Sequence, residues 1–112
     1  MKMVNTIYFF SLAAILFLVA LNAEAADQSI CNPDNSISLH ESGTLRSCRP
    51  SDDYTINGIT CKGDAPIHFY ANGNLESCVL SDDTTISGDK CKGDAPANFY
   101  SDGRLRSCIY PE

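Results

Sequence analysis

Six cysteines are the residues of this chain whose type and spacing most directly imply chemistry. They alternate 17 and 13 residues apart, so each equivalent cysteine recurs after 30 residues. They are Cys31, Cys48, Cys61, Cys78, Cys91 and Cys108. An even number of cysteines in a short exported chain predicts a disulfide framework. The sequence contains no C-x-x-C motif, the spacing used both by structural zinc knuckles and by redox-active cysteine pairs. We therefore expect structural disulfides.

Two near-neighbour pairing schemes are compatible with a repeated unit. The first joins Cys31–Cys48, Cys61–Cys78 and Cys91–Cys108. The second joins Cys48–Cys61 and Cys78–Cys91 and leaves the first and last cysteines unpaired. In an elongated stack those two lie too far apart to bond, because bridged Cα atoms are within about 7 Å of each other. We favour the first scheme over the second.

Other side chains that could support catalysis or bind a metal are few. His40 and His68 do not occupy equivalent positions in the repeat, so they do not form a repeated catalytic feature. The pairs Asp52-Asp53 and Asp82-Asp83 offer carboxylates, but calcium needs about six to eight oxygens from a tight loop and the EF-hand spacing is missing. We therefore expect no enzyme activity, no cofactor and no metal site.

The cysteines are positioned by a pattern that predicts a β-hairpin in each unit. Residues 67–70 and 75–79 alternate apolar and polar side chains on either side of Asn72-Gly73. The equivalent turns are Asp102-Gly103 and Ser42-Gly43. Serine tolerates a left-handed conformation poorly, which disfavours a two-residue type I′ turn. We expect a type I turn in which only the glycine is left-handed, followed by a bulge.

This turn predicts which side chains share a face. Phe69 is expected opposite Leu75, and Ile67 opposite Ser77. The apolar face then carries Ile67, Phe69, Leu75 and Val79, repeated as Ala97, Phe99, Leu105 and Ile109, and as Ile37, Leu39 and Leu45. The opposite face carries a candidate binding row, which consists of His40, Tyr70 and Tyr100 beside Arg46, Glu76 and Arg106. Tyrosine favours interfaces, but we favour the alternative that the tyrosines stack on one another and stabilise the pairing of the strands.

The connectors between the hairpins are also copies of one another. Residues 51–58 (SDDYTING) and 81–88 (SDDTTISG) each predict a turn followed by a short Thr-Ile strand. Residues 62–66 and 92–96, both KGDAP, predict the next turn. No stretch after residue 25 has sustained helical periodicity.

Residues 1–25 have the pattern of an export signal. Lys2 precedes an apolar stretch over residues 7–21, and Ala23-Glu24-Ala25 fits a signal-peptidase site. The apolar stretch is shorter than the roughly 20 residues that a membrane span requires. We expect cleavage after Ala25, leaving a repeat domain over residues 26–112 with units at about 31–60, 61–90 and 91–112.

The formal net charge of −6 bears on possible partners. Nucleic acids and anionic lipid surfaces both attract cationic proteins, so we expect neither as a partner. The mature domain is not expected to be embedded in a membrane.

The segments FYANGNLES (69–77) and FYSDGRLRS (99–107) resemble the F/Y-Y-x-x-G-x-L-x-S core of bacterial MORN-like repeats. The flanking C-K-G-D-A-P and S-C-x-L-x-x-D-x-T-I-x-G elements look like a cysteine-bearing, exported variant of that repeat. The first unit departs from it, with Leu39-His40 in place of Phe-Tyr, as is typical of a terminal repeat. The resemblance implies short hairpins stacked side by side, a scaffold or interaction role, and no catalytic residue.

The sequence therefore predicts an all-β, disulfide-stapled domain of three roughly 30-residue hairpin repeats, arranged as an elongated antiparallel sheet or solenoid. We expect a bacterial protein exported to the periplasm or the extracellular space. The leading function is a non-enzymatic module that binds another protein or an envelope component. The alternative is a small-ligand or carbohydrate-binding module that uses Tyr70 and Tyr100 as stacking platforms. A secreted inhibitor or toxin-like effector is a third class.

Overall fold

The computed structural model describes residues 26–34 and 36–112. The expected signal peptide, residues 1–25, lies outside the described residues. In the described part, the fold is all-β with one short turn of 3₁₀ helix. None of the helical structure in this part is long and apolar enough to cross a membrane.

The elements follow one another in a repeated order along the chain. A 3₁₀ helix, η1 (Gln28–Ile30), comes first. The strands are β1 (Ser38–Leu39), β2 (Leu45–Cys48), β3 (Tyr54–Ile56), β4 (Ile59–Cys61), β5 (Ile67–Phe69), β6 (Leu75–Val79), β7 (Thr84–Ile86), β8 (Asp89–Cys91), β9 (Pro96–Phe99) and β10 (Leu105–Cys108).

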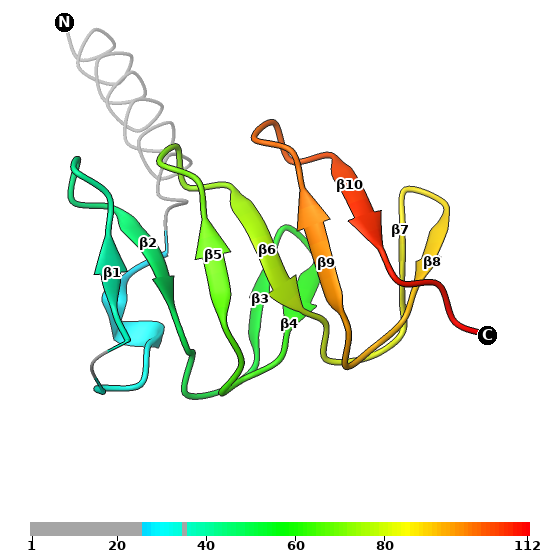
Figure 1. The fold of residues 1–112 in the computed structure, drawn as a ribbon, viewed down its shortest axis with the longest axis horizontal. Helices are drawn as coiled ribbons and strands as arrows, with labels where there is room; N and C mark the ends of the chain where they lie inside the picture. The colour runs from blue at the N-terminus through cyan, green and yellow to red at the C-terminus, as the bar shows by residue number, and fades with distance from the viewer. Residues whose placement is uncertain (1–25, 35) are drawn as a thin grey trace, which may run out of the picture.

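Three hairpins lie side by side in one antiparallel sheet of order β1-β2-β5-β6-β9-β10 (Figure 1). Each hairpin comes from one 30-residue unit. Neighbouring units are joined edge to edge, because β2 pairs with β5 and β6 pairs with β9. Over the described residues the sheet stays open: it neither closes on itself nor winds into a solenoid. Strands β1 and β10 form its two edges.

The turns of these sheet hairpins have the predicted form. Gly73 adopts a φ of 93°, and its N–H donates to the Tyr70 carbonyl at 2.9 Å. Gly43 and Gly103 repeat this conformation with φ of 96° and 97°. The residues before these glycines keep negative φ, so each turn is type I followed by a left-handed glycine.

The predicted register holds beside the turn and then fails. Phe69 lies opposite Leu75, as predicted. Ile67, however, lies opposite Cys78 instead of Ser77. The prediction was wrong because it allowed for only one irregularity, at the glycine.

The second irregularity is a bulge in β6 at Glu76. Two residues of β6, Leu75 and Glu76, face one residue of β5. The bulge reverses the alternation of the strand, so that Leu75 and Cys78 are both buried while Val79 is only half-buried. Ile109, at the position equivalent to Val79, is 49% exposed. Neither belongs to the fully buried core that the sequence predicted.

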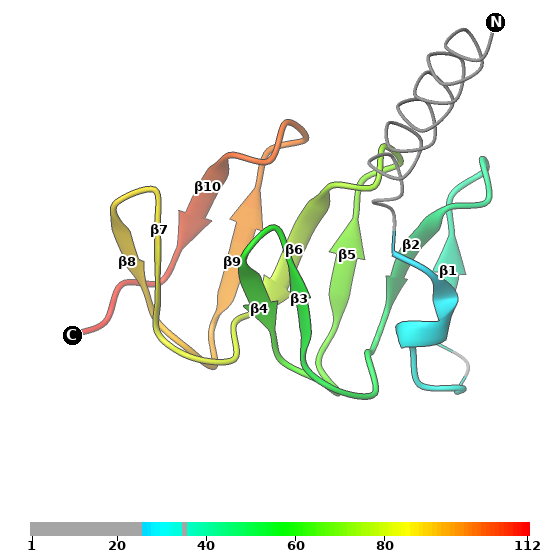
Figure 2. The same cartoon turned by 180° about the vertical axis from the view of Figure 1, so that it is seen from behind.

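Two further hairpins connect the units. In Figure 2 the hairpin of β3 and β4 lies in front of the sheet, and that of β7 and β8 lies beyond β10. Asn57-Gly58 has φ of 53° and 80°, and Ser87-Gly88 has φ of 52° and 89°. Two successive left-handed residues make these type I′ turns. The sequence predicted the first strand of each connector hairpin but not the second.

The core fills the space between the inner face of the sheet and the connectors. The sheet contributes Leu45, Ile67, Phe69, Leu75, Ala97 and Phe99, and the connectors contribute Ile56 and Ile86. The ring of Tyr54 in β3 packs edge-on against that of Phe69, with centroids 6.4 Å apart. Leu39, which the sequence placed on this face, is 40% exposed at the β1 edge.

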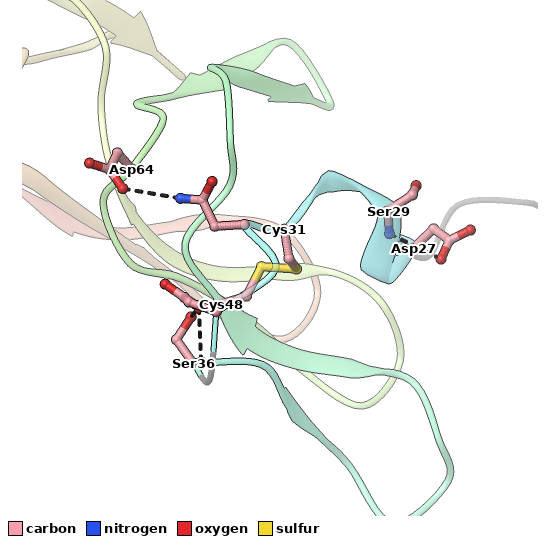
Figure 3. The surroundings of a disulfide bond; sticks show 8 residues. Asp27, Ser29, Cys31, Ser36, Cys48 and Asp64 are labelled. Atoms are coloured by element: carbon pink, nitrogen blue, oxygen red, sulfur yellow. Dashed lines mark hydrogen bonds between the residues drawn. A yellow bond between two sulfur atoms is a disulfide. The ribbon is translucent and has the colours of Figure 1, made fainter.

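Two disulfides tie a connector to the sheet hairpin that follows it, and the first ties the segment after η1 to β2. The three disulfides join Cys31–Cys48, Cys61–Cys78 and Cys91–Cys108, with Cα atoms 5.8, 5.7 and 5.6 Å apart. This is the first of the two schemes considered above. Figure 3 shows the first bridge, where Cys31 follows η1 and Cys48 lies in β2. Each bridge therefore joins the segment that precedes a sheet hairpin to the second strand of that hairpin, within one unit.

Candidate interaction surface

The His40–Tyr70–Tyr100 row connects units to one another. The Tyr70 hydroxyl donates to the Phe99 carbonyl of the next unit at 2.7 Å. One unit earlier, His40 Nε2 lies 2.8 Å from the Phe69 carbonyl, in the equivalent position. These contacts half-bury both side chains. Tyr100 has no following unit in the described chain and is 44% exposed.

A second set of contacts repeats the same pattern near the turns. Thr44 Oγ1 donates to the Ala71 carbonyl at 3.3 Å, and Asn74 Nδ2 donates to the Ser101 carbonyl at 2.8 Å. Arg104 occupies the next equivalent position, at the end of the series. Its guanidinium bonds instead to Asp102 within the same turn, at 2.8 Å.

The charged members of the predicted row do not gather into one site. Arg46, Glu76 and Arg106 are all exposed, each on a different hairpin. Arg106 of the row approaches Tyr100, with its guanidinium carbon 5.9 Å from the centre of the ring. The guanidinium carbon of Arg104, which is outside the row, lies 5.2 Å from the same centre. Such contacts between a cation and an aromatic ring are attractive. The predicted row is thus divided into an internal linking part and an open aromatic end at Tyr100.

Tyr70→Phe should lower the free energy of unfolding by about 1 kcal/mol, because it removes the hydroxyl donor and leaves the Phe99 carbonyl without that bond. Urea denaturation measures the change. Tyr100→Phe is the matched control, since no hydrogen bond of its hydroxyl is found among the described residues. Equal losses in the two variants would show that the bond between units does not stabilise the fold.

An ion pair also joins two units. Lys62 Nζ lies 2.6 Å from Asp94 Oδ1, with both side chains largely exposed. The hydrogen bond from Lys62, and then its charge, lower the pKa of Asp94, and the same contacts raise the pKa of Lys62. In the preceding unit Asn32 takes the position of Lys62, and its amide donates to Asp64 Oδ1 at 3.1 Å (Figure 3).

The thermal midpoint should fall as the pH drops below about 4. The folded pKa of Asp94 is lower than its ordinary value of 3.8. Stabilisation from this group is therefore present above pH 3.8 and is lost as the pH falls through the folded pKa. Asp94→Asn should flatten part of the acid decline in a scanning-calorimetry series from pH 2 to 7. Asp89→Asn is the control, because Asp89 belongs to neither ion pair of the described chain. An unchanged acid decline in Asp94→Asn would contradict the prediction.

The aspartate pairs have a structural role. Asp53 Oδ1 accepts the Gly63 N–H at 2.8 Å, and Asp83 Oδ1 accepts the Gly93 N–H at 2.7 Å. Both bonds span ten residues and hold the start of a connector against its end. Over the part of the chain that the structure describes, no group of three metal-ligating side chains comes together. His68 is exposed on β5.

A pocket that the sequence did not predict lies between the two connector turns. Its volume is about 310 Å³. Its apolar lining consists of Ile56, Ile59, Leu75, Ile86 and Phe99. The rest of the lining comes from the connectors, with Asn57, Gly58, Thr85 and Ser87, and from Gly103 in the last sheet turn. The sequence could not indicate it, because the pocket depends on how two connector hairpins from different units lie over the sheet.

Comparison of the chain with protein-family models, curated proteins and solved structures finds no match. The function is therefore inferred from the geometry of this chain alone.

Proposed function

We propose that this chain is an exported, non-enzymatic repeat module that binds another protein or an envelope component. The observation that carries the proposal is the distribution of exposed apolar side chains. The large ones among the described residues are Leu39, Tyr100, Ile109 and Tyr110. Leu39 is in the edge strand β1, Ile109 and Tyr110 follow the edge strand β10, and Tyr100 begins the turn that leads into β10. Apolar groups gathered at unpaired strands favour protein contact.

The disulfides support the export part of the proposal. Three bridges form and persist in an oxidising, non-cytoplasmic compartment. Together with the leader that the sequence predicts over residues 1–25, they favour the periplasm or the extracellular space. The 30-residue spacing of equivalent turns, bridges and bonds between units favours three copies of one MORN-like hairpin repeat.

The roles of the polar side chains support a non-enzymatic protein. Asp53 and Asp83 cap glycine N–H groups. His40 and Tyr70 engage backbone carbonyls of neighbouring units. His40, Asp53 and Asp83, which the sequence offered for chemistry, are thus used to hold the fold together.

Capture from envelope fractions tests the proposal. The oxidised protein, exported with its own leader, is immobilised and its captured proteins are quantified by mass spectrometry. Tyr100→Ser combined with Tyr110→Ser should abolish capture. His68→Ala changes an exposed side chain of β5, away from the edge, and should leave capture intact. Capture that survives the tyrosine changes, or that fails with the unchanged protein, would refute the proposal.

A small-ligand module is the second candidate, favoured by the pocket of about 310 Å³ and by the exposed ring of Tyr100. The tyrosine row is a weaker carbohydrate platform than the sequence implied, because Tyr70 is half-buried and its hydroxyl is bonded. A glycan array with the oxidised protein tests this candidate. Binding that is lost in Tyr100→Ser would favour it over the interaction module.

A further inference from the structure

We propose that a second copy of this chain docks through its β1 edge on the open β10 edge, so that copies assemble head to tail. The inference rests on the proposed function and names the partner. It follows from a comparison of equivalent positions at the two junctions inside the chain and at the two open edges. The side chains with which one unit contacts the next inside the chain occur again at β10, where no following unit is present among the described residues.

Burial at equivalent positions shows what the open edges expose. Leu80 is fully buried where a unit follows it, whereas Tyr110, thirty residues later, is 62% exposed. Phe69 and Phe99 are 1% and 3% exposed behind a preceding unit, whereas Leu39, their equivalent, is 40% exposed. The same repeat positions are thus apolar throughout and exposed only at the edges. Joining β10 to β1 of another copy would bury both sets at once.

The internal junctions define the register of that contact. Across β2 and β5, Cys48 lies opposite Ile67; across β6 and β9, Cys78 lies opposite Ala97. Moving on by 30 residues places Cys108 opposite Ile37 of the second copy. The Tyr100 hydroxyl would then meet the Leu39 carbonyl, as the Tyr70 hydroxyl meets that of Phe99. A strand added to an exposed edge is a common mode of protein recognition.

Charge at the two edges is complementary. The side chains of Thr44 and Asn74 donate to the carbonyls of Ala71 and Ser101 in the next unit. Thirty residues further on, the equivalent positions are Arg104 and, in a second copy, Glu41. Arg104 would therefore reach the backbone carbonyl of Glu41, which brings its positive charge close to the residue that carries the Glu41 carboxylate. Lys62 pairs with Asp94 of the next unit in the same way. The equivalent pair at the open edge is Lys92 and Asp34 of the second copy, because Asp34 occupies in the first unit the position that Asp94 occupies in the third. The present partner of Arg104, Asp102, is itself 55% exposed and easily left to solvent.

Head-to-tail contacts use two different surfaces, so they extend into filaments when no rotation closes them. A strand from another protein could occupy the same β10 edge. Exchanging the charges of Arg104 and Glu41 between two copies distinguishes the two occupants, because only contact between copies depends on both residues.

Sedimentation velocity of the oxidised, exported protein over a range of concentrations tests the proposal. We expect the average mass of the unchanged protein to rise with concentration. Arg104→Glu alone places two glutamates at the junction, and Glu41→Arg alone places two arginines there. Each should weaken association by about fivefold or more, the equivalent of an exposed charge pair. A 1:1 mixture restores an opposite pair at both kinds of junction, and should restore association.

Two further measurements complete the test. Thermal midpoints of the two charge variants at low concentration should match that of the unchanged protein, which shows that they fold. Tyr100→Phe should weaken association without changing that midpoint. A protein that stays monomeric at every concentration yet captures an envelope protein would overturn the second-copy proposal and leave the proposed function standing. A mixture that fails to restore association would overturn the register.

Discussion

Replacing Cys61 and Cys78 together with alanine should lower the free energy of unfolding by about 3 kcal/mol, because the bridge closes a 17-residue loop and restricts the unfolded chain. Alanine is chosen because both positions are buried and a serine hydroxyl would need a partner. The loss is large for a small domain, whose total stability is typically about 5–15 kcal/mol. Urea denaturation, with the midpoint and slope both fitted, measures it.

The last bridge provides the matched control. Cys91 and Cys108 close a loop of the same length, but Cys108 is only half-buried. Loop closure alone predicts equal losses for the two double alanine variants. A greater loss at Cys61 and Cys78 would measure the packing that this bridge adds at the centre of the core. Losses below about 1 kcal/mol for both pairs would show that the layers hold together without their bridges.

Gly63→Ala should destabilise the protein by about 1–3 kcal/mol, the usual cost of forcing extra atoms into a packed site. A Cβ at Gly63 would lie 2.7 Å from the carbonyl carbon of Asp52 and 2.9 Å from the backbone nitrogen of Asp53. Backbone atoms cannot turn aside as a side chain can, so the connector would have to shift. That shift would also stretch the bond from the Gly63 N–H to Asp53. Thermal and urea denaturation measure the loss.

Gly58→Ala separates this clash from conformational strain. Gly58 has a φ of 80°, and nothing lies within 4 Å of the place that a Cβ would take, so its substitution costs strain alone. Gly93→Ala should repeat the effect of Gly63→Ala, since its nearest backbone atoms are 2.6 Å away. If Gly63→Ala costs less than Gly58→Ala, the close approach of the two backbones does not limit the fold.

Much of the sheet could be predicted because the sequence signals for its turns and strands are local. Asn72-Gly73 between two alternating segments is enough to predict a hairpin, and the repeated glycine is enough to predict its turn. The cysteine period likewise limited the possible pairings, because identical units are expected to pair identically. The all-β class and the contact of Phe69 with Leu75 followed from these patterns.

The parts that escaped prediction depend on contacts between units. The bulge at Glu76 follows from the need to turn Cys78 toward the connector, which no pattern inside β6 reveals. Ser87, with a φ of 52°, shows that serine enters the left-handed region more readily than we expected. The acceptor of the Tyr70 hydroxyl belongs to the next unit, so its bond appears only when the register between units is known.

The placement of each bridge inside one unit bears on how the chain acquires its covalent structure. If the chain crosses a membrane with its N-terminus first, Cys31 and Cys48 reach the oxidising side before Cys61 does, and the next two pairs follow in the same order. An oxidant that joins cysteines as they emerge would then form only native bonds. Oxidative maturation can thus keep pace with translocation, without later reshuffling by an isomerase.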